Sequence, residues 1–248
     1  MSGHSKWAQI KRKKGVTDQK RGALFSKLAK EIVIAAKSGG GNPDGNARLR
    51  TAIDRAKAAS MPNENIKQAI LRGSGQLPGQ VYEEISYEGI GPGGIAIMVR
   101  CLTDSRNRSS ANIRHIFTKS GGNLGKSGSV SYLFQFVGLI TISREKYPNE
   151  DEVMEAVLTA GADDMETQDD LYQIKTKPGS VIEVSEALTA KGINCESVES
   201  VMLPNTFITP SIEEARSCMK LIQLLEEDDD VQNVYSNLEP PLELLAEE

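Results

Sequence analysis

The sequence predicts an α+β protein with a basic N-terminal three-helix domain followed by two ferredoxin-like α/β domains, the second inserted into the first. Three observations predict this arrangement. Lys and Arg are concentrated in the first quarter of the 248 residues, where apolar residues recur with helical spacing. Strand-like segments begin only after about residue 79. A complete β-α-β-β-α-β pattern then interrupts a second, incomplete pattern.

The overall net charge of −5 hides a strong asymmetry along the chain. Residues 1–75 hold 16 Lys and Arg against 5 Asp and Glu, a net charge of +11. Residues 76–131 hold 6 against 4, and residues 132–248 hold 7 against 25, a net charge of −18. A basic segment joined to acidic segments indicates an interaction module for a polyanion, and we expect the acidic domains to be held away from that partner.

The composition excludes several classes of protein. Hydrophobic residues make up 39% and charged residues 25%, as in an ordinary globular protein. No apolar run approaches the roughly 18 residues of a membrane-spanning helix, and the first residues carry charge rather than an apolar signal. Cys101, Cys195 and Cys218 are too widely spaced for a disulfide framework or a Cys-x-x-Cys metal site. We therefore expect a cytoplasmic protein with no membrane partner.

Three helices are expected in the first domain. The first ends in the glycine-rich residues 38–43, the second follows Asn46, and the third runs from Pro62 to Gly73. The apolar stripe of the first helix consists of Leu24, Phe25, Leu28, Ile32 and Ala36, with Lys20, Lys27, Lys30 and Lys37 expected on its opposite side.

Strands and helices alternate after residue 79. The expected strands are 81–87, 95–102, 130–136, 139–143, 163–167, 171–175, 193–202 and 231–236, and the expected helices are 107–119, 150–160, 180–190 and 211–226. The first four elements form β-β-α-β, the next six form a complete β-α-β-β-α-β unit, and the last helix and strand are left to complete the first set. The expected domains are therefore 1–78, 79–136 with 207–240, and the inserted 137–206.

Two glycine-rich segments resemble phosphate-binding loops but stand in the wrong context. Residues 89–94 match G-x-G-x-x-G, yet a strand follows where a dinucleotide site needs a helix, so we expect a hairpin turn. Residues 120–127 nearly match a Walker A loop, but a helix precedes them and a strand follows. We expect them to end that helix and form a turn.

Groupings of residues for catalysis or metal binding are almost absent. His4 and His115 are the only histidines, and neither stands in an HExxH motif. The acidic run 226–230 lacks the ligand spacing of an EF-hand and is expected to end a helix on a solvated surface. We therefore expect no enzymatic role and no metal site.

Two segments admit both a binding and a structural interpretation. Val130, Tyr132, Phe134 and Phe136 alternate along one strand face, as in sheets that stack RNA bases, but the RNP1 pattern is missing and we expect helices to cover them. Residues 104–109 carry two Arg and an Asn at a strand-to-helix junction. They suit either phosphate binding or a capping cluster with solvated arginines, and the sequence does not choose between the two.

Several motifs together resemble the YebC/PmpR family over nearly the whole chain. They are GHSKW at 3–7, KRG at 20–22, FSKL at 25–28, RLR at 48–50 with AI at 52–53, MP at 61–62, NI at 65–66, YEG at 87–89, GP at 91–92, LTD at 102–104, RNR at 106–108, GGNLG at 121–125 and GSV at 128–130. Ser105 stands where the family often has Asn, and Ala23 where a basic residue is common, so one basic contact is expected to be missing.

The resemblance implies three domains, no enzymatic activity, no cofactor, no small-molecule substrate and nucleic-acid contact through the basic helical domain. The family's strongest signature falls on residues 3–7. Because the chain begins directly at this signature, it is expected to be a bacterial cytosolic member of the family. We expect the protein to be a monomer. The resemblance and the charge pattern together predict the nucleic-acid-binding residues, which are His4, Ser5, Lys6, Trp7, Lys11, Arg12, Lys13, Lys14, Lys20, Arg21, Lys27, Lys30, Arg48, Arg50, Arg55, Arg106 and Arg108.

The sequence leaves open which nucleic acid the protein binds. The family's designation, probable transcriptional regulatory protein, favours DNA. The residues favour rRNA or tRNA, possibly on the ribosome, because Lys and Arg without an Asn or Gln set contact phosphate rather than base edges. A translation factor that relieves stalled elongation is therefore the alternative, and an acidic protein-interaction scaffold is a third.

Overall fold

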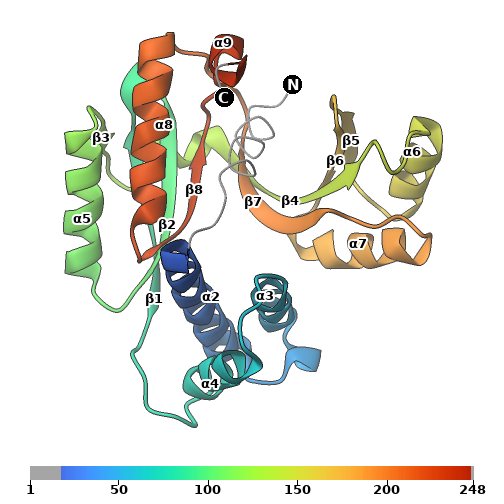
Figure 1. Ribbon diagram of the computed structural model, residues 1–248, viewed down its shortest axis with the longest axis horizontal. Coiled ribbons are helices and arrows are strands. Elements are labelled where there is room, and N and C mark those ends of the chain that lie inside the picture. Colours follow the sequence, from blue (N-terminus) through green and yellow to red (C-terminus); the bar gives the residue numbers. More distant parts are fainter. Residues whose placement is uncertain (1–17, 247–248) are drawn as a thin grey trace.

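The structure is a computed structural model that describes residues 18–246. Its elements form three lobes that meet at the centre of the molecule (Figure 1). We call them the helical lobe (18–73), the first-sheet lobe (83–124 and 212–236) and the second-sheet lobe (134–204). Within the described residues no helix combines the length and apolar content needed to cross a membrane.

The helical lobe contains three helices around a small core. They are α2 (Asp18–Gly39), α3 (Ala47–Ala58) and α4 (Asn63–Gly73), with a short 3-10 turn, Pro43–Gly45, before α3. Asn46 joins two of them: its side chain accepts a hydrogen bond from the N–H of Leu49 at 3.1 Å and donates to the carbonyl of Ala35 at 2.8 Å. Both ends of its amide are thereby satisfied in a buried position, which fixes where α3 starts. The predicted stripe faces the core, except for Leu24, which is exposed.

The first-sheet lobe is built on an antiparallel sheet of order β3-β1-β2-β8. Its elements are β1 (Glu83–Ile90), β2 (Ala96–Thr103), α5 (Arg106–Lys119), β3 (Asn123–Leu124), α8 (Ile212–Glu227) and β8 (Val231–Ser236), and a short α9 (Leu242–Ala246) follows. Figure 1 shows α5 and α8 side by side on one face of the sheet. Ile97, Val99, Phe117 and Leu221 share the core between them.

The second-sheet lobe has the strand order β5-β6-β4-β7. Its elements are β4 (Phe134–Ser143), α6 (Glu150–Thr159), β5 (Asp164–Thr167), β6 (Leu171–Thr176), α7 (Val181–Ala190) and β7 (Ser197–Pro204). This β-α-β-β-α-β element order is the ferredoxin-like one. The first sheet has the order β-β-α-β-α-β instead and differs from the ferredoxin-like pattern expected for both. The division of the chain into domains at the stated boundaries stays a prediction.

The two sheets are in contact through their helix-free faces. Ala96 and Met98 of β2 point away from α5 and α8 and pack with Val137 and Leu139 of β4 and with Val201 of β7. Side chains alternate between the two faces of a strand, so β2 contributes to both cores at once. This explains why β2 is apolar almost throughout.

The prediction of separate strands at 130–136 and 139–143 is wrong. Residues 134–143 form the single strand β4, and the third strand of the first sheet is the short β3. Gly138 lies inside β4 at a close approach: a Cβ there would collide with the Thr176 hydroxyl and lie 2.8 Å from Cβ of Val181. A glycine inside a strand commonly serves this purpose.

The prediction that alternating residues of 130–136 form one strand face covered by helices is also wrong. Residues 131–133 form a 3-10 turn, which interrupts the two-residue period. Val130 and Phe134 are buried, whereas Tyr132 is 71% exposed and Phe136 is 55% exposed. Phe136 faces a cavity between the lobes rather than a covering helix.

Candidate nucleic-acid interface

Much of the predicted interface precedes residue 18 and lies outside the described residues. This holds for His4, Ser5, Lys6, Trp7, Lys11, Arg12, Lys13 and Lys14. Of Lys20 only the backbone in α2 is described. Arg21 is exposed at the start of α2, and no ion pair joins it to another described residue.

Lys27 and Lys30 of α2 contact the acidic segment 226–230 that joins α8 to β8. The ammonium of Lys27 donates to the carbonyl of Glu226 at 2.6 Å. The ammonium of Lys30 donates to the carbonyl of Asp229 and to Oδ1 of Asp230, both at 2.8 Å. Burial is the largest influence on Lys27 and lowers its pKa, although nearby carboxylates act in the opposite direction. These two lysines hold the helical lobe against the first-sheet lobe.

Asp230 is the centre of this contact and is only 3% exposed. Besides Lys30, its carboxylate accepts hydrogen bonds from Nη2 of Arg108 at 2.8 Å and from the hydroxyl of Thr103 at 2.9 Å. Burial raises the pKa of Asp230, but the hydrogen bonds from Lys30, Arg108 and Thr103 outweigh it, so the pKa lies below its ordinary value. One buried carboxylate thus joins α2, β2 and α5.

The expectation that the acidic segment ends a helix on a solvated surface is therefore met only in part. The segment does end α8, and Glu227 and Asp229 are exposed, but Asp230 is buried. Lys27 and Lys30 of the basic lobe reach this segment, with donor-to-acceptor distances of 2.6–2.8 Å. Asp230 can be buried because its carboxylate is paired with the Lys30 ammonium and the Arg108 guanidinium and accepts a hydrogen bond from Thr103.

The 104–109 segment follows neither proposed interpretation completely. Nη2 of Arg108 lies 2.7 Å from Oδ1 of Asp104 as well as contacting Asp230. Nη2 of Arg106 lies 2.9 Å from Oε2 of Glu83. Both guanidiniums thus already have carboxylate partners, yet the side chain of Arg106 remains 68% exposed and that of Arg108 50% exposed.

Arg48 and Arg55 of α3 lie at the junction of all three lobes. Arg48 and Arg100 both donate to the carboxylate of Glu84, the former at 2.9 Å. Arg55 lies 3.7 Å from Glu31 and 3.8 Å from Glu199. These groups line a cavity of about 540 Å³ between the helical lobe and the two sheets. Their carboxylate partners favour a structural role at this junction over phosphate contact.

Arg50, in contrast, remains on the surface. Its guanidinium donates only to the carbonyls of Pro43 and Asp44, at 3.4 and 3.2 Å. It is exposed, as are Lys37, Lys57 and Lys67 of the same lobe. Carbonyl partners leave the positive charge of Arg50 uncompensated, so it suits phosphate better than Arg48 or Arg55.

Backbone N–H groups just after the Walker-like segment 120–127 already hold an anion. The carboxylate of Glu88, only 6% exposed, accepts hydrogen bonds from the N–H groups of Gly128, Val130 and Ser131 at 2.8–2.9 Å. Burial raises the pKa of Glu88, but these donors outweigh it, and the pKa lies below its ordinary value. Within the segment itself, Ser120 caps the end of α5 as expected, and the N–H of Gly125 donates to the carbonyl of Glu88.

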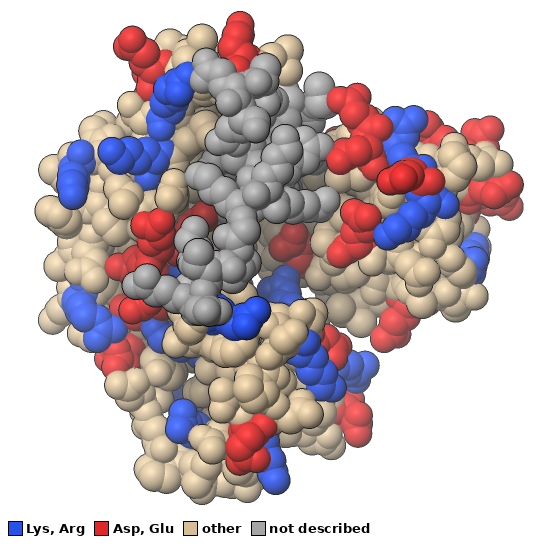
Figure 2. Space-filling view, in the orientation of Figure 1, with Lys and Arg blue, Asp and Glu red and all other residues tan. Residues whose placement is uncertain are grey.

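Surface charge differs between the lobes. Figure 2 shows Lys and Arg along the left edge and over the helical lobe at the bottom, and clusters of Asp and Glu over the second-sheet lobe on the right. Residues 134–204 hold 5 Lys and Arg against 14 Asp and Glu. A polyanion is therefore repelled from this lobe.

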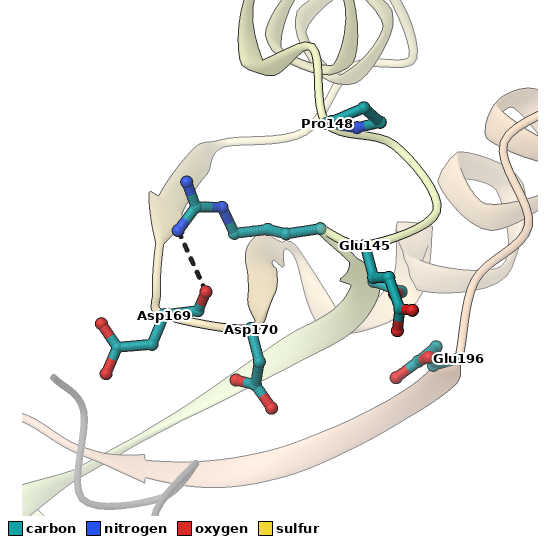
Figure 3. A pocket seen from close by; sticks show the side chains of 7 residues that line it. Glu145, Pro148, Asp169, Asp170 and Glu196 are labelled. Atoms are coloured by element: carbon teal, nitrogen blue, oxygen red, sulfur yellow. Dashed lines mark hydrogen bonds between the residues drawn. The ribbon is translucent and has the colours of Figure 1, made fainter.

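An acidic pocket of about 560 Å³ lies on the second-sheet lobe. Figure 3 shows Glu145, Asp169, Asp170 and Glu196 around it, with one guanidinium bonded to a backbone carbonyl. That guanidinium belongs to Arg144, which donates to the carbonyls of Gln168 and Asp169. Among the described residues no group of three or more His, Cys, Asp or Glu has the arrangement of a metal site.

The cysteines are unsuited to nucleophilic chemistry at neutral pH. Burial raises the pKa of both Cys101 and Cys218 to about 12, and it raises the pKa of Cys195 as well. Each thiol therefore stays protonated, whereas a nucleophile must be a thiolate.

Sequence reasoning missed three features of this region. It did not identify Asp230 as a shared partner, Glu88 as the anion in the loop, or Arg100 at the lobe junction. No local signal marks them, because each acts on residues distant in the chain. The exposed basic face of α5 did have a signal, since residues 105–129 contain no Asp or Glu.

Two family models match the chain. The one described as TACO1/YebC protein N-terminal domain matches residues 5–76, and the one described as TACO1/YebC second and third domain matches residues 82–238. A probable transcriptional regulatory protein of Dictyoglomus turgidum is 49% identical over 245 residues, which cover 99% of this chain and 98% of that protein. One from Geobacillus thermodenitrificans is 52% identical over 240 residues, covering 96% and 97%. The crystal structure of a conserved hypothetical protein from Aquifex aeolicus matches with a TM-score of 0.84 at 46% identity, covering 95% and 97%.

Proposed function

This chain belongs to the TACO1/YebC family, and from that premise we propose that it is a non-enzymatic, nucleic-acid-binding regulator of gene expression. The observation that carries the proposal is the charge asymmetry. The first 75 residues hold a net charge of +11, while the second-sheet lobe is strongly acidic. The basic N-terminal residues then contact the phosphate backbone, where each neutralised phosphate releases condensed counterions.

Four adjacent basic residues provide the test. Replacing Lys11, Arg12, Lys13 and Lys14 by Ala is expected to weaken binding to a mixed-sequence DNA duplex. The slope of log affinity against log salt should flatten by about 3–4 units, because each lost phosphate contact removes about 0.9 unit. Fluorescence anisotropy over a range of salt concentrations measures this slope.

A control variant removes three exposed positive charges from the acidic lobe instead. Replacing Lys146, Lys177 and Lys191 by Gln lowers the net charge by three at positions distant in sequence from the basic tail. This control should keep the wild-type slope. An unchanged slope in the N-terminal variant would remove that tail from the interface.

A ribosome-associated role in translation is the second proposal. It is favoured by the nature of the predicted contacts, which are Lys and Arg suited to phosphate and to the shape of structured RNA rather than to base edges. In-cell crosslinking followed by sequencing of the bound nucleic acid distinguishes the two. Predominant rRNA crosslinks support the translation role, and enrichment of promoter DNA without rRNA supports transcriptional regulation.

A further inference from the structure

The exposed face of α5 carries a second concentration of positive charge, outside the basic N-terminal quarter. Residues 105–129 contain five Lys and Arg and no Asp or Glu: Arg106, Arg108, Arg114, Lys119 and Lys126. With about 100° between successive helical residues, Arg108, Arg114 and Lys119 fall within an arc of roughly 140°. The opposite side of α5 is buried through Ser109, Ile113 and Phe117.

Three of these charges are uncompensated by the rest of the described chain. Arg106 and Arg108 pair with carboxylates, but no ion pair joins Arg114, Lys119 or Lys126 to another residue within 18–246. All three are exposed. Unpaired charges on a helix face gain most from a partner that brings its own negative charge.

The backbone that carries these side chains is fixed. Phe117 anchors α5 in the core and is fully buried. The turn that carries Lys126 is held by the Glu88 carboxylate and by the N–H of Gly125, which donates to the Glu88 carbonyl at 2.7 Å. The charges are therefore presented at set positions, which lowers the entropy lost on binding.

The chemistry of this face favours a nucleic-acid backbone over a protein or a membrane. None of the exposed large hydrophobic residues of the described chain lies on α5. A protein interface needs an apolar centre, and an interfacial helix needs apolar residues to insert, whereas phosphate contact needs neither. A helix of 14 residues is about 21 Å long, longer than the roughly 12 Å width of the DNA major groove, so both flanking backbones are within its reach.

The face also adjoins the helical lobe. Arg108 of α5 and Lys30 of α2 share the carboxylate of Asp230. The start of α5 therefore lies beside the lobe that carries the basic N-terminal segment, and Figure 1 shows α2 reaching the end of the first-sheet lobe.

We propose that α5 and the 125–129 turn form a second phosphate-binding surface, with Arg114, Lys119 and Lys126 as its principal contacts. This proposal rests on the proposed function, because it extends nucleic-acid binding to the first-sheet lobe. It assigns a direct role in binding to a part of the chain outside the basic domain.

The test replaces Arg114, Lys119 and Lys126 by Gln in the full-length protein and measures binding to a 30-base-pair mixed-sequence DNA duplex and to an rRNA hairpin. For whichever probe the wild type binds, we expect the salt slope to fall by about 2–3 units. The matched control is the Lys146, Lys177 and Lys191 triple Gln variant, which makes the same charge change on the acidic lobe. All six positions are exposed, so the thermal unfolding temperature should be unchanged in both variants. Measuring it checks that each variant is folded.

The outcomes separate this proposal from the proposed function. If the wild type binds and the α5 variant behaves like the control, the α5 surface is overturned while the proposed function stands. Equal losses in both variants would indicate a net-charge effect only and would overturn it too. If the wild type binds neither probe in a salt-dependent manner, both proposals fail.

Discussion

Replacing Asp230 by Asn is expected to lower the free energy of unfolding by about 3 kcal/mol. The substitution removes the negative charge that Lys30 and Arg108 share. It also turns the N–H hydrogens of the Asn amide toward the N–H donors of these two residues, where no hydrogen bond can form. Lys30 is only 13% exposed in its side chain, so its ammonium cannot recover full hydration. Arg108 is half exposed, which keeps the cost near the lower end of the range for broken buried ion pairs. Urea unfolding measures the change.

The neighbouring Asp229 provides the matched control. It is exposed, and its backbone carbonyl rather than its carboxylate accepts the bond from Lys30. Asp229→Asn therefore makes the same charge change one residue away and should alter stability by less than about 0.5 kcal/mol. Equal effects of the two substitutions would show that the total charge of the segment matters and that Asp230 has no special place.

Replacing Glu88 by Gln is the second substitution with a large expected effect, a loss of about 2–3 kcal/mol. The carboxylate accepts three charge-assisted hydrogen bonds from buried or half-buried N–H groups. The Gln side chain keeps one carbonyl oxygen as an acceptor, but its NH2 group faces the remaining backbone N–H donors and cannot accept hydrogen bonds from them. Amide exchange should accelerate at Gly128, Val130 and Ser131, and hydrogen-exchange mass spectrometry measures this locally.

The effect of Glu88 should depend on pH in a defined direction. Its pKa is lowered in the folded protein, so the stabilisation is fully present above the ordinary value of 4.5 and is lost as pH falls through the lower folded value. The stability difference between wild type and Glu88→Gln should therefore be constant near neutral pH and shrink in acid below pH 4.5. A difference that grows in acid would contradict the assignment.

Glu83→Gln is the control for both experiments on Glu88. Glu83 lies on the same strand, but it pairs with Arg106 on the surface. Exposed pairs of this kind contribute at most about 1 kcal/mol. Its substitution should leave amide exchange at Gly128, Val130 and Ser131 unchanged.

Much of the fold follows from local patterns. The helical periods, the cap at Asn46 and the glycine stop after residue 73 gave helices close to α2, α3 and α4. Element counting left a final helix and strand to complete the first set, and β8 does pair with β2. The prediction of two strands at 130–136 and 139–143 missed that Gly138 lies inside β4, where the side chains of Thr176 and Val181 leave no room for a Cβ.

The candidate site was less accessible to sequence reasoning. A Lys on an amphipathic helix looks solvated unless its partner is known, and the partner of Lys30 lies 200 positions away. The same applies to Arg48, whose partner Glu84 belongs to another lobe. Charge composition identifies which segments are basic, but pairing decides which of those charges remain available to a ligand.

The amino-acid sequence alone was enough to predict most of the helical and strand segments, though not those of residues 123–143, and to show the family resemblance and the concentration of positive charge at the N-terminus. These depend on spacing and composition along the chain. Only the tertiary structure decided that Lys27, Lys30 and Arg108 are held by the acidic segment 226–230, whereas Arg114, Lys119 and Lys126 are left unpaired within the described residues. An ion pair forms only when its two groups lie within a few ångströms of each other, and folding brings together charges that the chain separates.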